Sequence, residues 1–224
     1  RECKTYLNGE QNKGLHAEID ALPLTADQQN VLGALKEFVS AGMEKCFLLQ
    51  GYAGTGKTFL IRRFVQWLQS EKMGFMLSAP TGRAGKVLAE KTGYPAGTIH
   101  RSIYGMDKLL EIPGAKEEDR FKFYYGLKLI APDERPRVIV VDESSMVSDR
   151  EDDEKFLRFG SGRLLKDLLE FAGEKQGDSR CQIVFVGDPA QLPPIGMDIS
   201  PALDAEYLKK EFGVESRRAA LRQV

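Results

Sequence analysis

Four short apolar runs stand out along the chain, and residues with helical spacing separate each run from the next. The runs cover residues 46–50, 75–79, 138–141 and 182–186. The third, Val138–Val141, is apolar at every position, which is typical of a strand buried on both faces of a parallel sheet. The sequence therefore predicts an α/β fold: a doubly wound, mostly parallel sheet with helices on both faces. Such folds place their chemistry at the carboxyl ends of the strands.

Amphipathic patterns between and after these runs predict the helices. In the first of them, Val31, Leu35 and Phe38 share one face, and Gly42 ends the pattern. The stretch Thr25–Gln28 predicts a capping box at its start, with Gln28 at the third helical position. Helices are expected over residues 24–42, 60–72, 81–93, 164–172 and 202–212.

Three stretches lack a regular period. Residues 1–22 are polar and are expected to be a lead-in or the tail of an upstream domain, followed by one domain over 23–224. Residues 104–136 mix aromatic and charged side chains with prolines, and we expect a hairpin-like insertion there. The acidic stretch 149–154 predicts a solvated loop or the start of a helix. Because the chain begins with Arg1 rather than Met, we also expect it to be a fragment of a longer protein.

The composition is that of an ordinary soluble globular protein. The 224 residues have a formal net charge of −1, which excludes a uniformly basic DNA-coating protein but allows a local basic surface. No apolar run approaches the length of a membrane span, so we expect no membrane partner. Of the cysteines Cys3, Cys46 and Cys181, two begin apolar runs, where cysteine is usually buried. This scattered set argues against disulfides or zinc and indicates a reducing, cytoplasmic location.

Residues 51–58 match the phosphate-binding loop pattern G-x-x-x-x-G-K-[ST] directly after the first apolar run. Glycines let the backbone curl so that several N–H groups point at one polyphosphate. Lys57 would carry a positive charge to the β- and γ-phosphates, and the Thr58 hydroxyl would bind Mg²⁺. A glycine-rich turn that matches by accident is the alternative, but the flanking strand and helix patterns favour a nucleotide site. The loop residues expected to hold the nucleotide are Gly51, Ala53, Gly54, Thr55, Gly56, Lys57 and Thr58.

Two carboxylates, Asp142 and Glu143, follow the buried run Val138–Val141. Asp142 would hold Mg²⁺ through water, and Glu143 could accept a proton from the attacking water. The alternative is structural, because acidic residues often cap the helix that follows a strand. The phosphate-binding loop upstream favours the catalytic interpretation.

Further motifs carry a resemblance to superfamily 1 DNA helicases, most of all to the 5′-to-3′ branch with RecD-like, Dda-like and Pif-like enzymes. The chain contains Asp-Glu-Ser-Ser-Met at 142–146 and Gly-Asp-Pro-Ala-Gln-Leu-Pro-Pro at 187–194, which resemble motifs II and III of that family. Upstream, Leu-Thr-Ala-Asp-Gln at 24–28 resembles the adenine-reading Q motif, and Ala-Pro-Thr-Gly-Arg-Ala at 79–84 resembles motif Ia. These pieces occur in the family's order from about Leu24 onward.

The resemblance implies a RecA-like fold in which the motif III strand inserts between the motif I and motif II strands. It implies ATP and Mg²⁺ as cofactors, adenine recognition by Gln28 and γ-phosphate sensing by Gln191, in addition to catalytic roles for Lys57 and Glu143. The capping box alone also accounts for Gln28. Single-stranded DNA is the implied partner, although His100 by itself is a common surface residue. The DNA contacts implied are Pro80, Thr81, Arg83, Thr98 and His100.

Helicases of this family need two RecA-like domains, with an arginine from the second region completing the nucleotide site. The resemblance therefore implies a second RecA-like domain of the same parent chain, and possible nuclease or recombination subunits as further partners. The completing arginine is either Arg222 or a residue beyond Val224. Two alternatives stay open: another nucleic-acid-stimulated ATPase, such as a relaxase helicase module or an RNA translocase, and a nucleotide-binding regulatory domain that hydrolyses nothing.

Overall fold

A computed structural model of the chain describes residues 22–111, 123–130, 136–151, 157–174 and 181–222. Its centre is a six-stranded sheet in the order β3-β2-β6-β8-β1-β9, in which every pairing is parallel. The strands of this sheet are β1 Cys46–Gly51, β2 Phe75–Ala79, β3 Ala96–Thr98, β6 Val138–Val141, β8 Gln182–Gly187 and β9 Ser216–Leu221. The expected lead-in over residues 1–22 lies almost wholly outside the described residues.

Strand β8 lies between β1 and β6, so the strand before the Gly187–Pro194 loop separates the other two site-bearing strands. Leu48 pairs with Phe185 on one side of β8, and Val140 pairs with Val184 on the other. This order confirms the strand insertion that the family resemblance implied. It also places the ends of the three strands next to one another.

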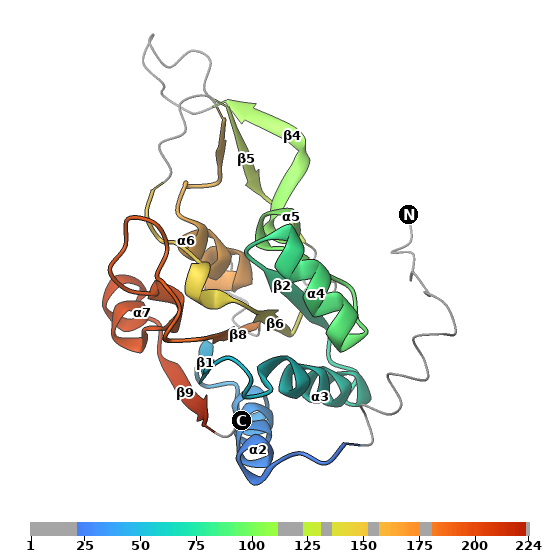
Figure 1. The fold of residues 1–224 in the computed structure, drawn as a ribbon. Helices are drawn as coiled ribbons and strands as arrows, with labels where there is room; N and C mark the ends of the chain where they lie inside the picture. Colours follow the sequence, from blue (N-terminus) through green and yellow to red (C-terminus); the bar gives the residue numbers. More distant parts are fainter. Residues whose placement is uncertain (1–21, 112–122, 131–135, 152–156, 175–180, 223–224) are drawn as a thin grey trace.

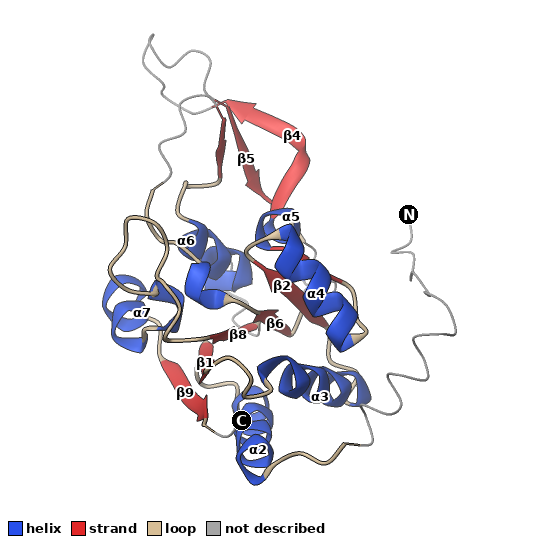
Figure 2. Ribbon diagram, in the orientation of Figure 1, coloured by secondary structure: helices blue, strands red, loops and turns tan. Residues whose placement is uncertain are grey.

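Helices cover both faces of the sheet (Figures 1 and 2), as the unbroken apolar runs predicted. One core cluster packs α2, α3 and α4 against one face, and the other packs α5, α6 and α7 against the opposite face. Successive strand residues such as Phe47 and Leu48 belong to different clusters, because side chains alternate across a strand. The helices are α2 Ala26–Ala41, α3 Lys57–Ser70, α4 Gly82–Thr92, α5 Ile99–Ile103, α6 Leu164–Leu169 and α7 Ala205–Phe212.

The capping residues predicted from the sequence mark the observed ends of α2. Thr25 and Gln28 form the predicted capping box at the start of α2, and Gly42 ends that helix in the left-handed region with φ 64°. Two predicted helices are shorter than expected. The segment after Leu164 changes to a π-helical turn at Glu170–Glu174, and α7 is preceded by a separate 3-10 turn, Pro201–Leu203.

A smaller sheet of β4 Tyr104–Glu111, β5 Phe123–Leu127 and β7 Leu157–Phe159 lies beside the main one. Strands β4 and β5 pair antiparallel, which agrees with the hairpin expected over 104–136 for the residues that are described. In Figure 1 this pair extends away from the six-stranded sheet. The boundaries of the insertion itself stay a prediction.

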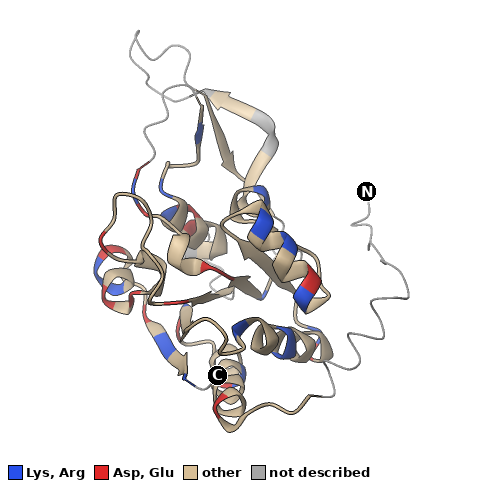
Figure 3. Cartoon of the chain, viewed as in Figure 1, with Lys and Arg blue, Asp and Glu red and all other residues tan. Residues whose placement is uncertain are grey.

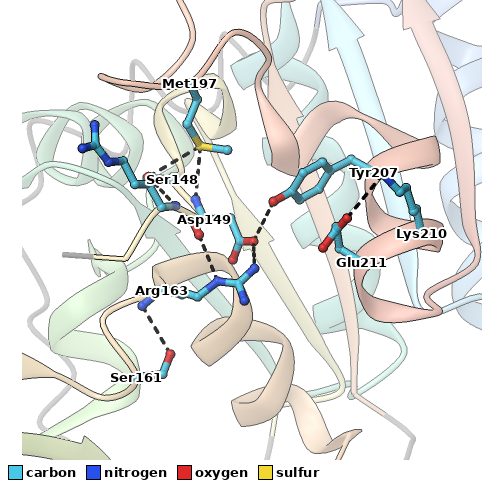
Figure 4. Close-up of polar contacts among 9 residues, drawn as sticks. Ser148, Asp149, Ser161, Arg163, Met197, Tyr207, Lys210 and Glu211 are labelled. Carbon is cyan, nitrogen blue, oxygen red and sulfur yellow. Dashed lines mark hydrogen bonds and ion pairs between the residues drawn. The ribbon is translucent and has the colours of Figure 1, made fainter. Parts of the chain in front are cut away.

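Asp149 corrects one part of the expectation for the acidic stretch 149–154, because it is buried rather than solvated, whereas residues 152–154 lie outside the described residues. Only 3% of the residue is exposed, and its carboxylate pairs with the Arg163 guanidinium and accepts a hydrogen bond from the Tyr207 hydroxyl at 2.8 Å. The Asp149 N–H also points at the Met197 sulfur, 3.5 Å away (Figure 4). Burial, and then the Asp149 carboxylate, raise the pKa of Tyr207 to about 12. These four residues, hereafter the Asp149 cluster, join four separate segments of the chain.

Within the described residues, no helix combines the length and the apolar composition needed to cross a membrane. Cys46, the first residue of β1, and Cys181, just before β8, are both buried, as expected for cysteines at the start of apolar runs. Cys3 lies outside the described residues.

Candidate functional site

Three loops meet at the carboxyl edge of the main sheet, because β1, β8 and β6 are neighbours and run in the same direction. Between these loops lies a cavity of about 500 Å³. Its size suits a bound small molecule. The residues that line it are Ala53, Gly54, Gly56, Lys57, Thr58, Phe59, Arg62, Lys91, Asp142, Glu143, Asp188 and Gln191.

The loop after β1 is tightly curled around positions that have no room for a side chain. A Cβ added at Gly51 would lie 2.7 Å from the Thr55 hydroxyl oxygen, and one at Gly56 would lie 2.5 Å from Nε2 of Gln28. Gly56 also has φ 81°, a left-handed conformation that other residues rarely adopt. The Thr55 hydroxyl donates to the Tyr52 carbonyl at 2.9 Å and closes the loop on itself. The left-handed backbone at Gly56 and the crowding at Gly51 account for these two glycines of the motif.

Lys57 and Thr58 are the first two residues of α3, so they stand at the positive end of a helix dipole. The Lys57 ammonium donates to the carbonyls of Gly51 at 2.6 Å and Tyr52 at 2.9 Å. These contacts hold its charge directly over the loop. A helix N-terminus with backbone N–H groups and a lysine is a physically suitable place for a phosphate group.

Asp142 and Glu143 follow β6 and point into the same cavity. Burial raises the pKa of Asp142 to about 6, and the Glu143 charge adds to it. The Glu143 N–H, which donates to Asp142 Oδ1 at 3.0 Å, and the charges of Lys57 and Lys91 oppose this shift. The alternative interpretation of the pair was that acidic side chains cap the following helix. Glu143 does not act as such a cap. Its side chain makes no capping hydrogen bond to the 3-10 turn Ser144–Met146 that follows.

Gln191 reaches the carboxylate of Glu143 from the loop after β8. Its Nε2 donates to Glu143 Oε2 at 3.2 Å, and its Oε1 accepts a hydrogen bond from the Ser145 hydroxyl at 2.7 Å. The structure therefore brings Lys57, Glu143 and Gln191, the predicted catalytic set, to one cavity.

Gln28 lies against the phosphate-binding loop. Its Oε1 accepts from the Thr25 N–H at 3.1 Å, and its Nε2 donates to the Thr55 carbonyl at 3.4 Å. The residue is 9% exposed, and it is not among the described residues that line the cavity. The capping role is thus present in the structure, and adenine recognition stays a prediction.

The residues predicted to contact DNA gather at the ends of two neighbouring strands. Thr81 caps α4 and Thr98 caps α5, each by accepting a backbone N–H through its side chain, and β2 pairs with β3 in register at Ala79 and Thr98. Pro80 and Arg83 flank Thr81 in the sequence. His100, in the helix that Thr98 caps, lies against aromatic rings, with its ring centroid 5.0 Å from that of Phe159 and 5.6 Å from that of Tyr104, and lines a further cavity of about 380 Å³.

Several residues at the cavity were missed in the sequence. Arg62 is 4% exposed and donates to the carbonyls of Lys91 and Thr92. Its only signal was that two arginines, Arg62 and Arg63, interrupt the apolar residues of α3 between Ile61 and Phe64. Asp188 was part of a quoted motif but had no role assigned. Ser145, which is fully buried and bonds to Gln191, had no signal of its own.

A protein-family profile described as an AAA domain matches residues 23–200. The chain belongs to this family. It is 30% identical over 173 residues to the ATP-dependent RecD2 DNA helicase of Deinococcus radiodurans, and 29% identical over 194 residues to the ATP-dependent DNA helicase Dda of Enterobacteria phage T4. These alignments cover 77% and 84% of this chain. The kinship with superfamily 1 DNA helicases that the motifs indicated is therefore confirmed.

The fold comparison agrees with this kinship. The Pif1 helicase of Candida albicans matches with a TM-score of 0.54 and 22% identity, over 91% of this chain and 40% of that one. The predicted RecA-like α/β fold is thereby confirmed. The chain spans only 18% of the length of RecD2 and 36% of Dda, so these relatives are much longer than the stretch described.

Proposed function

We propose that this chain is the first motor domain of an ATP-dependent DNA helicase that moves 5′-to-3′ along single-stranded DNA. One observation carries the proposal: a phosphate-binding loop, a carboxylate pair and Gln191 converge on one cavity of about 500 Å³. The relatives RecD2 and Dda, both ATP-dependent DNA helicases, support the substrate class and the energy source.

ATP with Mg²⁺ is the cofactor that fits this cavity. The curled loop, in which Gly56 has a left-handed φ of 81°, offers N–H groups to a polyphosphate, and Lys57 supplies the compensating charge. The Thr58 hydroxyl and the Asp142 carboxylate both line the cavity and are hard oxygen ligands of the kind that Mg²⁺ prefers. A bound divalent cation would neutralise developing charge on the phosphates. It would also favour the ionised form of Asp142.

Single-stranded DNA is the partner we propose for the surface around α4 and α5. Arg83 and Lys86 are exposed on α4, and Figure 3 shows basic segments (blue) along this part of the ribbon. The helix N-terminus at Thr81 presents backbone N–H groups, which suit phosphate oxygens. We keep Pro80, Thr98 and His100 as further contacts on the basis of the family motif.

We further propose a second RecA-like domain that covers the nucleotide and supplies an arginine. The greater length of RecD2 and Dda supports it. Within the described chain, Arg222 lies at the end of β9, where its N–H donates to Asp27 at 2.7 Å, and it does not line the cavity. Nuclease or recombination subunits remain possible further partners by analogy with the family alone.

The decisive experiment is steady-state ATP hydrolysis by a longer protein that contains this chain and the second domain, with and without single-stranded DNA. We expect strong stimulation by DNA and loss of it in Lys57→Ala. Equal stimulation by RNA would favour an RNA translocase, and absence of stimulation would reject the helicase proposal. Unwinding of duplexes with a 5′ or a 3′ single-stranded tail then tests the direction of movement.

A further inference from the structure

Two consecutive buried serines follow the carboxylate pair and bond to different parts of the chain. Both Ser144 and Ser145 are fully buried. The Ser144 hydroxyl donates to the Val141 carbonyl at 2.7 Å, three residues away. The Ser145 hydroxyl donates at the same distance of 2.7 Å to Oε1 of Gln191, which is 46 residues away. One serine therefore closes a local turn, and the other joins two loops of the site.

Ser145 and Glu143 together fix which way the Gln191 amide faces: the Glu143 carboxylate only accepts and takes the NH₂ group, and the Ser145 hydroxyl donates to the remaining Oε1. A glutamine amide has one acceptor oxygen and one NH₂ donor, and they exchange places when the amide turns over. With Oε1 held by the Ser145 hydroxyl, the NH₂ group is directed to Glu143 Oε2 at 3.2 Å. Gln191 is an exposed residue, so packing against neighbouring side chains does not impose this orientation of the amide. The orientation follows from the two hydrogen bonds.

Ser145 is itself held from two sides, so it is a rigid anchor. Its carbonyl accepts a hydrogen bond from the Ser200 hydroxyl at 3.2 Å. Strand β8 ends in close contact with it, because a Cβ at Gly187 would lie 3.1 Å from the Ser145 nitrogen and 2.6 Å from the Leu203 side chain. The motif II turn and the loop after β8 are therefore packed together at this serine.

We propose that Ser145 is a positioning residue for Gln191: its hydroxyl holds the amide so that the NH₂ group faces Glu143 and the end of the cavity beside Lys57, and this sets the preference for a nucleoside triphosphate over a diphosphate. The inference rests on the proposed function, because it takes the cavity as a nucleotide site with the terminal phosphate near Glu143. It adds to the family motif a residue that neither contacts the nucleotide nor transfers a proton.

The test compares the affinities for MgATP and MgADP, measured by calorimetry on a longer protein that contains this chain and the second RecA-like domain, and on four variants of it. The variants are Ser145→Ala, Ser144→Ala, Gln191→Ala and the double variant Ser145→Ala/Gln191→Ala. Ser145→Ala is expected to lower the ratio of ATP to ADP affinity by roughly three- to tenfold, the factor that a net hydrogen bond contributes. Ser144→Ala removes an equally buried hydroxyl with an equally short bond and should leave the ratio unchanged. The double variant should match Gln191→Ala alone, because Ser145 acts through that amide.

Thermal melting of each variant separates positioning from folding. Both serine variants are expected to lose similar stability, whereas only Ser145→Ala changes the ratio. If Ser145→Ala keeps the wild-type ratio, if both serine variants change it equally, or if the wild type does not prefer ATP, the positioning role is wrong while nucleotide binding stands. If the wild type binds neither nucleotide, the proposed function fails, and this inference fails with it.

Discussion

At the scale of single residues, Glu143 has a left-handed backbone with φ 53° and ψ 38°. Such a conformation is uncommon for a residue other than glycine and costs on the order of 1–3 kcal/mol. It turns the chain sharply between β6 and the 3-10 turn Ser144–Met146, and the carboxylate then lines the cavity and accepts the hydrogen bond from Gln191. Strain that is held by a buried surrounding is common at functional sites.

Glu143→Gln should retain ATP binding and lower turnover by roughly 10²- to 10⁴-fold, because its amide keeps the shape of the side chain but takes no proton from water. The amide oxygen can still accept the hydrogen bond from Gln191. Binding by calorimetry and hydrolysis by phosphate release, in a chain with the second domain, measure the two effects separately. Turnover at the wild-type rate would remove Glu143 from the catalytic set.

Lys57→Ala should abolish most nucleotide binding while the fold survives. The side chain is only partly buried and contacts two loop carbonyls, so we expect a stability change of about 1 kcal/mol or less. ATP affinity should fall at least about tenfold, which corresponds to 1.4 kcal/mol. Lys86→Ala is the matched control, since Lys86 is 79% exposed in a surface pair with Glu90. Comparable ATP affinity in Lys57→Ala would contradict the phosphate role.

Gln28→Ala should lower the free energy of unfolding by about 1–2 kcal/mol, because it removes half of the capping box and the bond to the Thr55 carbonyl. The predicted adenine recognition has a separate readout, the ratio of ATP to GTP affinity in competition binding. If Gln28 reads the base, the variant loses this preference. A destabilised variant with an unchanged preference would leave Gln28 as a cap and a support for the loop only.

At the scale of elements, the Asp149 cluster joins the segment after β6 to α6, to α7 and to the loop that carries Met197. Arg163 lies just before α6, and Tyr207 is in the first turn of α7. The sequence alone suggested a solvated acidic stretch, because nothing local shows that partners 14 and 58 residues away meet at Asp149. Burial of an acidic residue depends on these distant partners, so a local pattern could not reveal it.

Asp149→Asn should therefore destabilise the fold by roughly 1.5–3 kcal/mol, the range for hydrogen bonds to a charged group. Glu151→Gln is the matched control, because its pair with Arg158 is exposed at 3.5 Å and such pairs contribute about 1 kcal/mol or less. Urea unfolding followed by circular dichroism measures both. Equal, small losses in the two variants would show that the Asp149 cluster adds little to stability.

In the six-stranded sheet, the strands that the sequence predicted are the interior strands, and those it did not predict are the two edge strands. The four interior strands are buried on both faces and appear as apolar runs. The two edge strands, β3 and β9, have partly exposed residues, and β9 carries Arg217 and Arg218. Charged residues are common on edge strands, where they hinder pairing with other chains. In β9, Arg217 instead pairs with Glu37 and Glu44, so a basic terminal sequence concealed a strand.

At the scale of the whole molecule, the site was predictable to the level of its loops. Each predicted cluster follows a strand, and parallel strands bring their carboxyl ends to one edge. The family resemblance predicted the order of three strands only, with β8 between β1 and β6. Neither the sequence pattern nor the family resemblance predicted the hydrogen bonds that orient the side chains. Ser145 and Gln191, for example, are 46 residues apart and meet only in the folded chain.

The same whole-molecule geometry predicts that the 224-residue chain alone binds ATP weakly and hydrolyses it very slowly, even with single-stranded DNA. Among the described arginines, Arg62 lines the cavity but donates to the carbonyls of Lys91 and Thr92, and Arg222 does not line it. A supplied arginine accelerates related phosphoryl transfers by roughly a thousandfold or more. Exposure of the nucleotide to water would also weaken every electrostatic contact in the site.

Single-stranded DNA should bind the chain weakly as well, because a formal net charge of −1 provides little general attraction for phosphates. Steady-state hydrolysis by this chain, measured beside a longer protein with the second domain, tests the prediction. A rate within about tenfold of the longer protein would mean that Arg222 or Arg62 already completes the site, since a missing arginine costs far more than that. The Arg222→Ala and Arg62→Ala variants would then identify which of the two does so. A much slower chain whose rate is restored by adding the second domain in trans would instead assign the arginine to that domain.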